Sequence, residues 1–496
     1  MSAVTNNPDG SSLSNKEEYV VSVSSHKQKE ASSSGFARWF QWFEPGTSPK
    51  EKKLILKLQF FILSYSMLAY FLKYLDQTNI SNAYVSGMKE DLNLNGNQLS
   101  WFNTFFNIGT IVGSIPAVFL ANYFRPRYFL PIMDLLWALT VLFVYKCSTA
   151  NQIYVCRFFL GLFESATNPF GHVMLGSWFK SNEVLRLGNL YIIAGIIGQA
   201  TSSYIQSGLQ SSMEGRLGLH AYQWMFIFEA CLSVPIIIYG LFVIPDYPYN
   251  TQAFYLNEWE RKRAKERLEE DGRVTKKISY NLDTLKEITF SWQPYVFSIG
   301  YCLWTLTAAS YMLQFFEVYL KSLKKYSISY INNFPTIISG VNLVTMLSSG
   351  YIADKMNRRW PVLMVVGCLL TVSMAILLKS HDEGVRKFGY CLTGVYGCYT
   401  PMLAGWCNIS CKKSLVLRSF TIPAMIVIGT IVVTPYQQHV FPSSDAPYYE
   451  KTQGMRYAIA FTVCLLLWTS IAIPLCDYYW GNKDDAKVKK DPEYQL

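Results

Sequence analysis

Long apolar stretches alternate with short polar ones along most of this chain. A helix needs about 20 mostly apolar residues to cross the hydrocarbon core of a bilayer, and the sequence contains twelve such stretches. They cover residues 56–77, 98–122, 128–146, 151–177, 186–209, 223–244, 294–320, 330–353, 361–379, 387–410, 417–439 and 455–479. The pattern predicts an all-α integral membrane protein with twelve transmembrane helices.

A longer polar stretch divides these spans into two sets of six, which predicts two bundles related by a pseudo-two-fold axis. The charged segment 257–271 within that stretch predicts a solvated surface helix. Lysines just before the first span favour cytoplasmic termini. The predicted parts are a disordered cytoplasmic tail (1–53), an N-terminal bundle (54–244), a cytoplasmic linker (245–292), a C-terminal bundle (293–480) and a cytoplasmic tail (481–496).

Composition agrees with a membrane protein and excludes several other classes. The chain of 496 residues is 51% hydrophobic and 16% charged, with a mean hydropathy of +0.14, whereas soluble domains carry about 25% charged residues. The net charge of +10 comes from basic residues between the spans, so it reflects topology rather than nucleic-acid binding. The eleven cysteines lie mostly inside spans without metal-ligand spacing. We predict no metal, no cofactor and no enzymatic activity.

Two charges in the fourth span are the strongest functional candidates. Ionisable residues cost several kcal/mol in a membrane unless they are paired or face water. Arg157 and Glu164 are seven residues apart, so both project from one helical face. An arginine fork suits a carboxylate, and burial raises the proton affinity of a carboxyl group. We predict that Arg157 binds substrate and Glu164 carries a proton; the alternative is a structural ion-pair network.

Other spans carry further charges. Asp76, near the end of the first span, is a candidate second proton site, and Lys73 is either its partner or a cation for substrate. The alternative for both is an interfacial role at the helix end. Asp134 and Glu229 are expected to be structural partners of neighbouring helices, and Glu317 is expected to reach the outer interface.

Polar aromatic residues recur at helical spacing in the later spans. Tyr301 and Trp304 lie in the seventh span and Tyr399 in the tenth, where they are candidates for lining a substrate cavity. Packing or an interfacial aromatic belt is the competing interpretation, because the chain contains 34 tyrosines.

The loop after the eighth span reads GYIADKMNRR. It resembles the loop signature G-x-x-x-D-[RK]-x-G-R-R of the major facilitator superfamily. Asp354, Arg358 and Arg359 are therefore predicted to form a cytoplasmic latch that pairs neighbouring helices in one conformational state. The alternative is that these charges only set topology.

Four segments resemble one branch of that superfamily, the fungal anion:cation symporter family of allantoate, pantothenate and vitamin permeases. They are YLDQTNISNAYVSGMKEDL, RFFLGLFES, LGSWFK and NISCKKSLVLRSF. The resemblance implies proton-coupled import of a small organic anion at the plasma membrane. We predict that the chain is a monomer. It places the proton-coupling acids at Asp76 and Glu164 and the substrate arginine at Arg157.

The first span departs from the family pattern at one position. Members commonly have Asp-Arg there, whereas Gln77 follows Asp76 in this chain. Gln77 and Lys73 are kept as candidate substrate-binding residues, and Lys73 offers a point charge rather than a fork. The departure favours a monocarboxylate or a zwitterion, including a sulfur-containing compound, over a dianion.

Two other functions remain open on the same fold. A drug or metabolite:proton efflux antiporter usually carries a longer Gly-Pro signature in the fifth span, where this chain has only AGIIGQ. A nutrient sensor that does not transport would be expected to have long folded tails, and the predicted tails are short.

Overall fold

The computed structural model describes residues 43, 46–271, 282–356, 358–411 and 415–480. The chain divides into two compact units, residues 1–56 and 57–496, and the contacts described below all lie within the second. Every regular element in the described residues is helical, which agrees with the predicted all-α class.

The elements before and within the linker are α3 (Pro49–Leu58), η1 (Gln59–Leu63), α4 (Ser64–Ala83), η2 (Tyr84–Met88), α5 (Lys89–Asp91), α6 (Gln98–Tyr123), α7 (Pro126–Val144), α8 (Ala150–Glu164), α9 (Thr167–Trp178), α10 (Ser181–Ser212), η3 (Arg216–Gly218), α11 (Ala221–Val243), α12 (Glu258–Glu270) and α13 (Leu282–Phe290). The later elements are α14 (Gln293–Leu306), η4 (Ala309–Tyr311), α15 (Met312–Ser322), α16 (Ile328–Asn333), η5 (Phe334–Thr336), α17 (Ile337–Met356), α18 (Trp360–Lys379), α19 (Glu383–Thr393), η6 (Gly394–Cys398), α20 (Tyr399–Ser410), α21 (Leu415–Val440), η7 (Ser443–Asp445), α22 (Gly454–Leu467) and η8 (Trp468–Ala472).

Each predicted span corresponds to a helical segment. Eight helices in the described residues are long and apolar enough to cross a membrane. The other four spans are α6, α10 and two interrupted segments, α8 with α9 and α19 with α20. The chain thus has the predicted twelve-helix architecture. The boundaries assigned to the tails, linker and bundles stay predictions.

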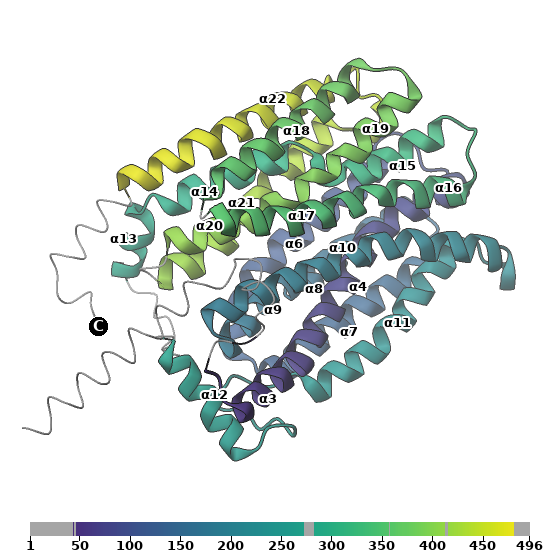
Figure 1. The fold of residues 1–496 in the computed structure, drawn as a ribbon. Coiled ribbons are helices and arrows are strands. Elements are labelled where there is room, and N and C mark those ends of the chain that lie inside the picture. Colours follow the sequence, from purple (N-terminus) through teal and green to yellow (C-terminus); the bar gives the residue numbers. More distant parts are fainter. Residues whose placement is uncertain (1–42, 44–45, 272–281, 357, 412–414, 481–496) are drawn as a thin grey trace, which may run out of the picture. The chain divides into compact units, whose positions relative to one another are not determined.

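The helices pair in the same way in both halves. In the first half, α4 packs along α10, α6 along α8 and α7 along α11. In the second half, α14 packs along α21 and α18 along α22 (Figure 1), and α17 packs against η6. Counted as spans, these are pairs 1–5, 2–4 and 3–6, which recur as 7–11, 8–10 and 9–12. This repetition supports the predicted relation between two six-helix halves.

Glycine allows α6 and α8 to approach closely. A Cβ at Gly161 of α8 would lie 2.1 Å from the carbonyl oxygen of Phe106, and a Cβ at Gly109 of α6 would lie 2.0 Å from that of Phe158. Lipid provides little hydrophobic driving force for helices to associate. Small residues favour association instead, because they let the two backbones pack closely. This crossing fixes the rotation of α8, and with it the direction of Arg157 and Glu164.

We name the two ends of the helical bundle after one residue at each. At the Glu90 end, where α4 finishes and α6 begins, polar contacts join the two halves. They are Glu90–Lys321 (2.8 Å), Ser86–Asn332 (3.0 Å), Asn103–Gln314 (3.0 Å) and Ser207–Asn333 (2.8 Å).

At the opposite Glu260 end, the linker helix α12 docks on the first half. Arg267 is buried and lies 2.6 Å from Glu183 at the start of α10, and Glu260 is 2.7 Å from Lys57. The predicted linker helix is therefore present, but the expectation that it is solvated is wrong on this face. Its ion pairs anchor it to the bundle.

Candidate functional site

Five ionisable side chains meet inside the first half: Lys73 and Asp76 on α4, Arg157 and Glu164 on α8, and Glu229 on α11. We call them the buried charge cluster. Each is at most 4% exposed. Helical spacing explains the pairs on α4 and α8, because residues three or seven apart share a face. The close α6–α8 crossing turns the α8 pair inward.

Two donors on α4 contact the carboxyl group of Glu164. The Nζ atom of Lys73 lies 3.2 Å from its Oε1 atom, and the Nε2 atom of Gln77 donates to the same oxygen over 3.1 Å. The Oε2 atom has no hydrogen-bond partner among the described residues. The structure therefore brings together three of the predicted site residues and pairs Lys73 with Glu164.

Arg157 is surrounded by carboxyl groups but keeps part of its fork free. Asp76, Glu164 and Glu229 all interact electrostatically with its guanidinium group, which lies 6.0 Å from the ring centre of Phe106. Within the described part of the chain, its Nη2 atom has no hydrogen-bond partner. A buried guanidinium group with an unused donor can bind a carboxylate by donating hydrogen bonds to it.

Asp76 on α4 and Glu229 on α11 are two acids buried where these helices pack together. The indole N–H of Trp137 on α7 donates to one oxygen of Asp76, whose other oxygen has no donor among the described residues. The carboxyl group of Glu229, on the neighbouring helix α11, influences that of Asp76 electrostatically. The sequence interpretation missed the place of Glu229 in this cluster and the bond from Trp137. The only signal was the lone acid in the apolar run FIFEACLS.

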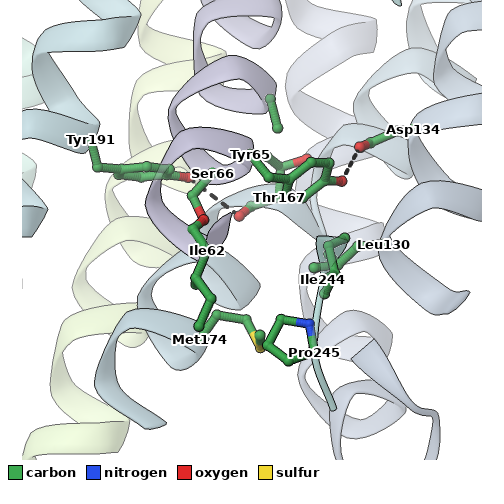
Figure 2. A pocket seen from close by; sticks show the side chains of 12 residues that line it. Ile62, Tyr65, Ser66, Leu130, Asp134, Thr167, Met174, Tyr191, Ile244 and Pro245 are labelled. Atoms are coloured by element: carbon green, nitrogen blue, oxygen red, sulfur yellow. Dashed lines mark hydrogen bonds between the residues drawn. The ribbon is translucent and has the colours of Figure 1, made fainter. Parts of the chain in front are cut away.

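Asp134 lies in a separate environment near the Glu260 end. The hydroxyl group of Tyr65 donates to its carboxylate, and Tyr191 donates to the carbonyl oxygen of Thr167 nearby (Figure 2). These side chains line a cavity of about 20 Å³. That volume is close to the minimum for a single water molecule and is too small for a nutrient. Asp134 is thus a partner of a neighbouring helix, as expected.

Glu317 does not reach the outer interface, so that expectation is wrong. It is fully buried, and its carboxyl group faces the hydroxyl group of Ser81 on α4. The helix that carries Glu317, α15, is separated from α14 by the break at η4 and packs against α4 of the first half.

The aromatic candidates have different surroundings. Tyr301 and Trp304 lie with their ring centres 5.1 Å apart, and the indole nitrogen of Trp304 has no partner among the described residues. Tyr399 is fully buried, and its hydroxyl group donates to the carbonyl oxygen of Leu363 on α18 over 3.0 Å. That bond uses the Tyr399 hydroxyl within the second half, so we leave Tyr399 out of the proposed site.

The predicted latch is only partly described. The side chain of Asp354 lies outside the described residues, Arg358 is exposed, and Arg359 is half-buried beside Gly405 of α20. The latch stays a prediction. In the part of the chain that the structure describes, no group of three or more His, Cys, Asp or Glu residues could hold a metal ion.

Comparison with known proteins assigns this architecture to a family. Residues 66–416 match the model of the Major Facilitator Superfamily. The chain is 48% identical to the MFS transporter PfmaC of Pestalotiopsis fici over 448 residues, which cover 90% of this chain and 84% of that protein. It is 32% identical to the pantothenate transporter liz1 of Schizosaccharomyces pombe over 409 residues, which cover 82% and 79%.

A solved structure gives the same architecture. The crystal structure of a D-xylose–proton symporter matches with a TM-score of 0.61 and covers 83% of this chain and 97% of that one. The sequence identity is 14%, so this likeness concerns the fold alone.

Proposed function

Because this chain belongs to the Major Facilitator Superfamily and is a multi-pass membrane transporter, we propose that it is a proton-coupled importer of a small organic anion that carries one carboxylate. The observation that carries the proposal is the free donor of Arg157 inside the buried charge cluster. Membrane interiors retain such a charge at a high free-energy cost, and intramembrane ionisable residues commonly mark substrate or ion pathways.

In this proposal Arg157 binds the substrate carboxylate. Its planar fork can make two parallel hydrogen bonds to a carboxylate, which lysine cannot. Lys73 and Gln77 hold Glu164 beside it, and they adjust when substrate enters. Tyr301 and Trp304 of α14 contribute the wall from the second half.

The charge count explains why a proton is required. With all five groups ionised, the cluster has two cations and three carboxylates, a net charge of −1. An anion would be repelled in that state. Protonation of Asp76 or Glu164 removes the excess negative charge, so a bound proton favours binding of the anion. By linkage, a bound anion favours binding of the proton to the same extent.

The substrate class follows from the first span and the relatives. The pantothenate transporter liz1 is 32% identical to this chain, and pantothenate carries a single carboxylate. Gln77 stands where a second substrate arginine is common in the resembled family, so a monocarboxylate such as pantothenate, or a zwitterionic sulfur compound, fits better than a dianion such as ureidosuccinate.

The membrane orientation completes the mechanism. We place the transporter in the plasma membrane as a monomer with both termini and the Glu260 end in the cytoplasm. The Glu90 end then faces outward and is closed by contacts between the halves. Uptake requires the halves to rock apart there, take up substrate and proton, and release both inside.

The first experiment measures uptake of radiolabelled pantothenate, biotin, allantoate and a sulfur amino-acid derivative by cells expressing the chain, with and without a protonophore. Accumulation of at least one substrate that the protonophore abolishes is expected. Arg157→Ala removes a charged hydrogen bond, which contributes roughly 1.5–3 kcal/mol, so uptake should fall by about ten- to hundredfold. Glu164→Gln should abolish accumulation.

Two further variants serve as controls. Arg157→Lys keeps the charge without the fork and should transport poorly. Arg456→Ala alters an exposed arginine at the start of α22 and should transport normally. Proton-driven uptake that is unchanged in both Arg157→Ala and Glu164→Gln at equal surface levels would refute the proposal. Proton-driven export instead of import would assign the chain to the efflux antiporters.

A further inference from the structure

Glu229 is the acid in the cluster with the fewest partners. It lies in the middle of α11 and is 1% exposed. Neither carboxyl oxygen has a hydrogen-bond donor among the described residues. An isolated carboxylate in such a place costs several kcal/mol, so the group is protonated or shares a proton with an acceptor.

Asp76 is the acceptor that faces it. Asp76 and Glu229 lie on two helices that pack together, and their carboxyl groups are near enough to influence each other electrostatically. The Oδ2 atom of Asp76 already receives the indole N–H of Trp137, while Oδ1 has no donor among the residues described. Two carboxyl groups that share a site cannot both ionise readily. One proton between Asp76 and Glu229 turns a repulsive contact into a hydrogen bond.

The charged groups around Glu229 leave this proton in place. Arg157 of α8 attracts a negative charge on Glu229, whereas Glu164 of the same helix repels it. Lys73 of α4 is paired with Glu164 at 3.2 Å. Asp134 of α7 is engaged by Tyr65. The net charge of −1 for the fully ionised cluster means that a single proton makes it neutral.

Glu164 differs because it has cationic and amide donors for its charged form. Lys73 and Gln77 both reach its Oε1 atom, and hydrogen bonds to a carboxylate stabilise the ionised state. The three acids therefore separate into Glu164, which has two donors, and the pair Asp76 and Glu229, which have only the Trp137 indole between them among the described residues.

We propose that Asp76 and Glu229 together form the proton-binding site of this transporter and share the coupling proton, while Glu164 stays ionised and positions Lys73 and Gln77. This inference rests on the proposed function and changes its proton site from Asp76 with Glu164 to Asp76 with Glu229. The shared proton neutralises the cluster and leaves Arg157 free for the substrate carboxylate.

The experiment compares Glu229→Gln, Asp76→Asn and the control Ser233→Ala, which lies one turn from Glu229 on α11 and bonds only to its backbone carbonyl. Glutamine keeps the size of the side chain and can donate to Asp76 without a titrating proton. Both acid variants should lose proton-driven accumulation by at least about tenfold and keep substrate exchange across the membrane. Wild-type uptake should fall as external pH rises, and the uptake left in Glu229→Gln should not depend on pH.

A second measurement does not depend on transport. Infrared difference spectra of the purified protein, taken on a pH change, should contain a protonated carboxylic acid band that is absent from both acid variants and present in Ser233→Ala. The double variant should equal either single one, because both remove the same site.

Three outcomes separate the hypotheses. A band that persists in Glu229→Gln, or wild-type pH dependence in that variant, overturns the shared-proton site while leaving proton-coupled import intact. Loss of exchange as well as accumulation in Glu229→Gln, at normal protein levels, also overturns it, because the residue would then act in substrate binding or folding. A wild-type chain without proton-driven uptake would refute the proposed function, and the spectra would still decide whether Asp76 and Glu229 share a proton.

Discussion

At the scale of single residues, the site depends on which charges have partners. Lys73 and Gln77 hold Glu164, Trp137 holds one oxygen of Asp76, and part of the Arg157 fork has no partner among the described residues. In a low-dielectric interior an unpaired polar atom is costly. The unpaired donor is therefore the most informative atom in the cluster, and the paired lysine is the less suitable substrate ligand.

The role of Lys73 can be tested by a double-mutant cycle. Lys73→Gln should lower uptake by about tenfold, because it replaces the charged donor of Glu164 with a neutral one. The double variant Lys73→Gln, Glu164→Gln should be no worse than Glu164→Gln alone if Lys73 acts only through Glu164. Exchange of internal for external substrate in cells with matched surface levels would measure this, because exchange does not require the accumulation that Glu164→Gln abolishes. Additive losses would make Lys73 a substrate ligand in its own right.

Sequence reasoning found residues at this scale but not their partners. Asp76, Arg157 and Glu164 could be selected because charge is rare in apolar spans. Their contacts with Trp137 and Glu229 join helices far apart in the chain, and they depend on the rotation of each helix. The inward rotation of Glu317 and the bond from Tyr399 to Leu363 were missed for the same reason.

At the scale of elements, the α6–α8 crossing positions the cluster. The Cβ of an alanine at Gly161 would lie 2.1 Å from the carbonyl oxygen of Phe106, and backbone cannot give way as a flexible side chain can. The helices would have to separate, which would move Arg157 and Glu164 relative to α4. A displacement of about 1 Å can reduce activity by about a hundredfold.

Gly161→Ala is therefore expected to reduce uptake by at least about tenfold. Gly208→Ala on α10 is the matched control, because a Cβ there meets no atom within 4 Å. Uptake and surface level, measured for both variants, test the prediction. Equal transport by Gly161→Ala and Gly208→Ala would show that the crossing tolerates expansion and does not set the geometry of the site.

Hydropathy located the spans well because length and apolar content are what a bilayer selects. It did not show where spans break. The residues between α8 and α9, η4 after α14, and η6 between α19 and α20 all lie inside apolar stretches. Such breaks depend on packing against other helices, which supplies partners for the freed backbone groups.

At the scale of the whole molecule, the repeated pairing of helices defines two halves, and contacts at the Glu90 end join them. The hydroxyl group of Ser207 on α10 donates to the side chain of Asn333 on α16 over 2.8 Å. If the Glu90 end faces outward, a covalent bond between these positions should hold the outer entrance shut.

The test is a double variant, Ser207→Cys, Asn333→Cys, made in a background without the three exposed native cysteines. We expect it to lose uptake on oxidation and to regain uptake on reduction. Each single cysteine variant, treated with the same oxidant, should transport normally, because it cannot form the bond between the halves. Radiotracer uptake before and after reductant makes the comparison. Full uptake by the oxidised Ser207–Asn333 pair would contradict a requirement for opening at the Glu90 end.

The most direct test of the central claim follows protons and substrate together in proteoliposomes of purified protein. Pantothenate, or the substrate that the uptake panel identifies, is added outside the liposomes. The lumen should then acidify, as reported by a pH-sensitive dye enclosed in it. The same addition to Arg157→Ala liposomes should give a signal that is at least about tenfold smaller. Substrate entry by the wild type without acidification, or acidification of wild-type size in Arg157→Ala, would contradict coupled binding of a carboxylate and a proton in the buried charge cluster.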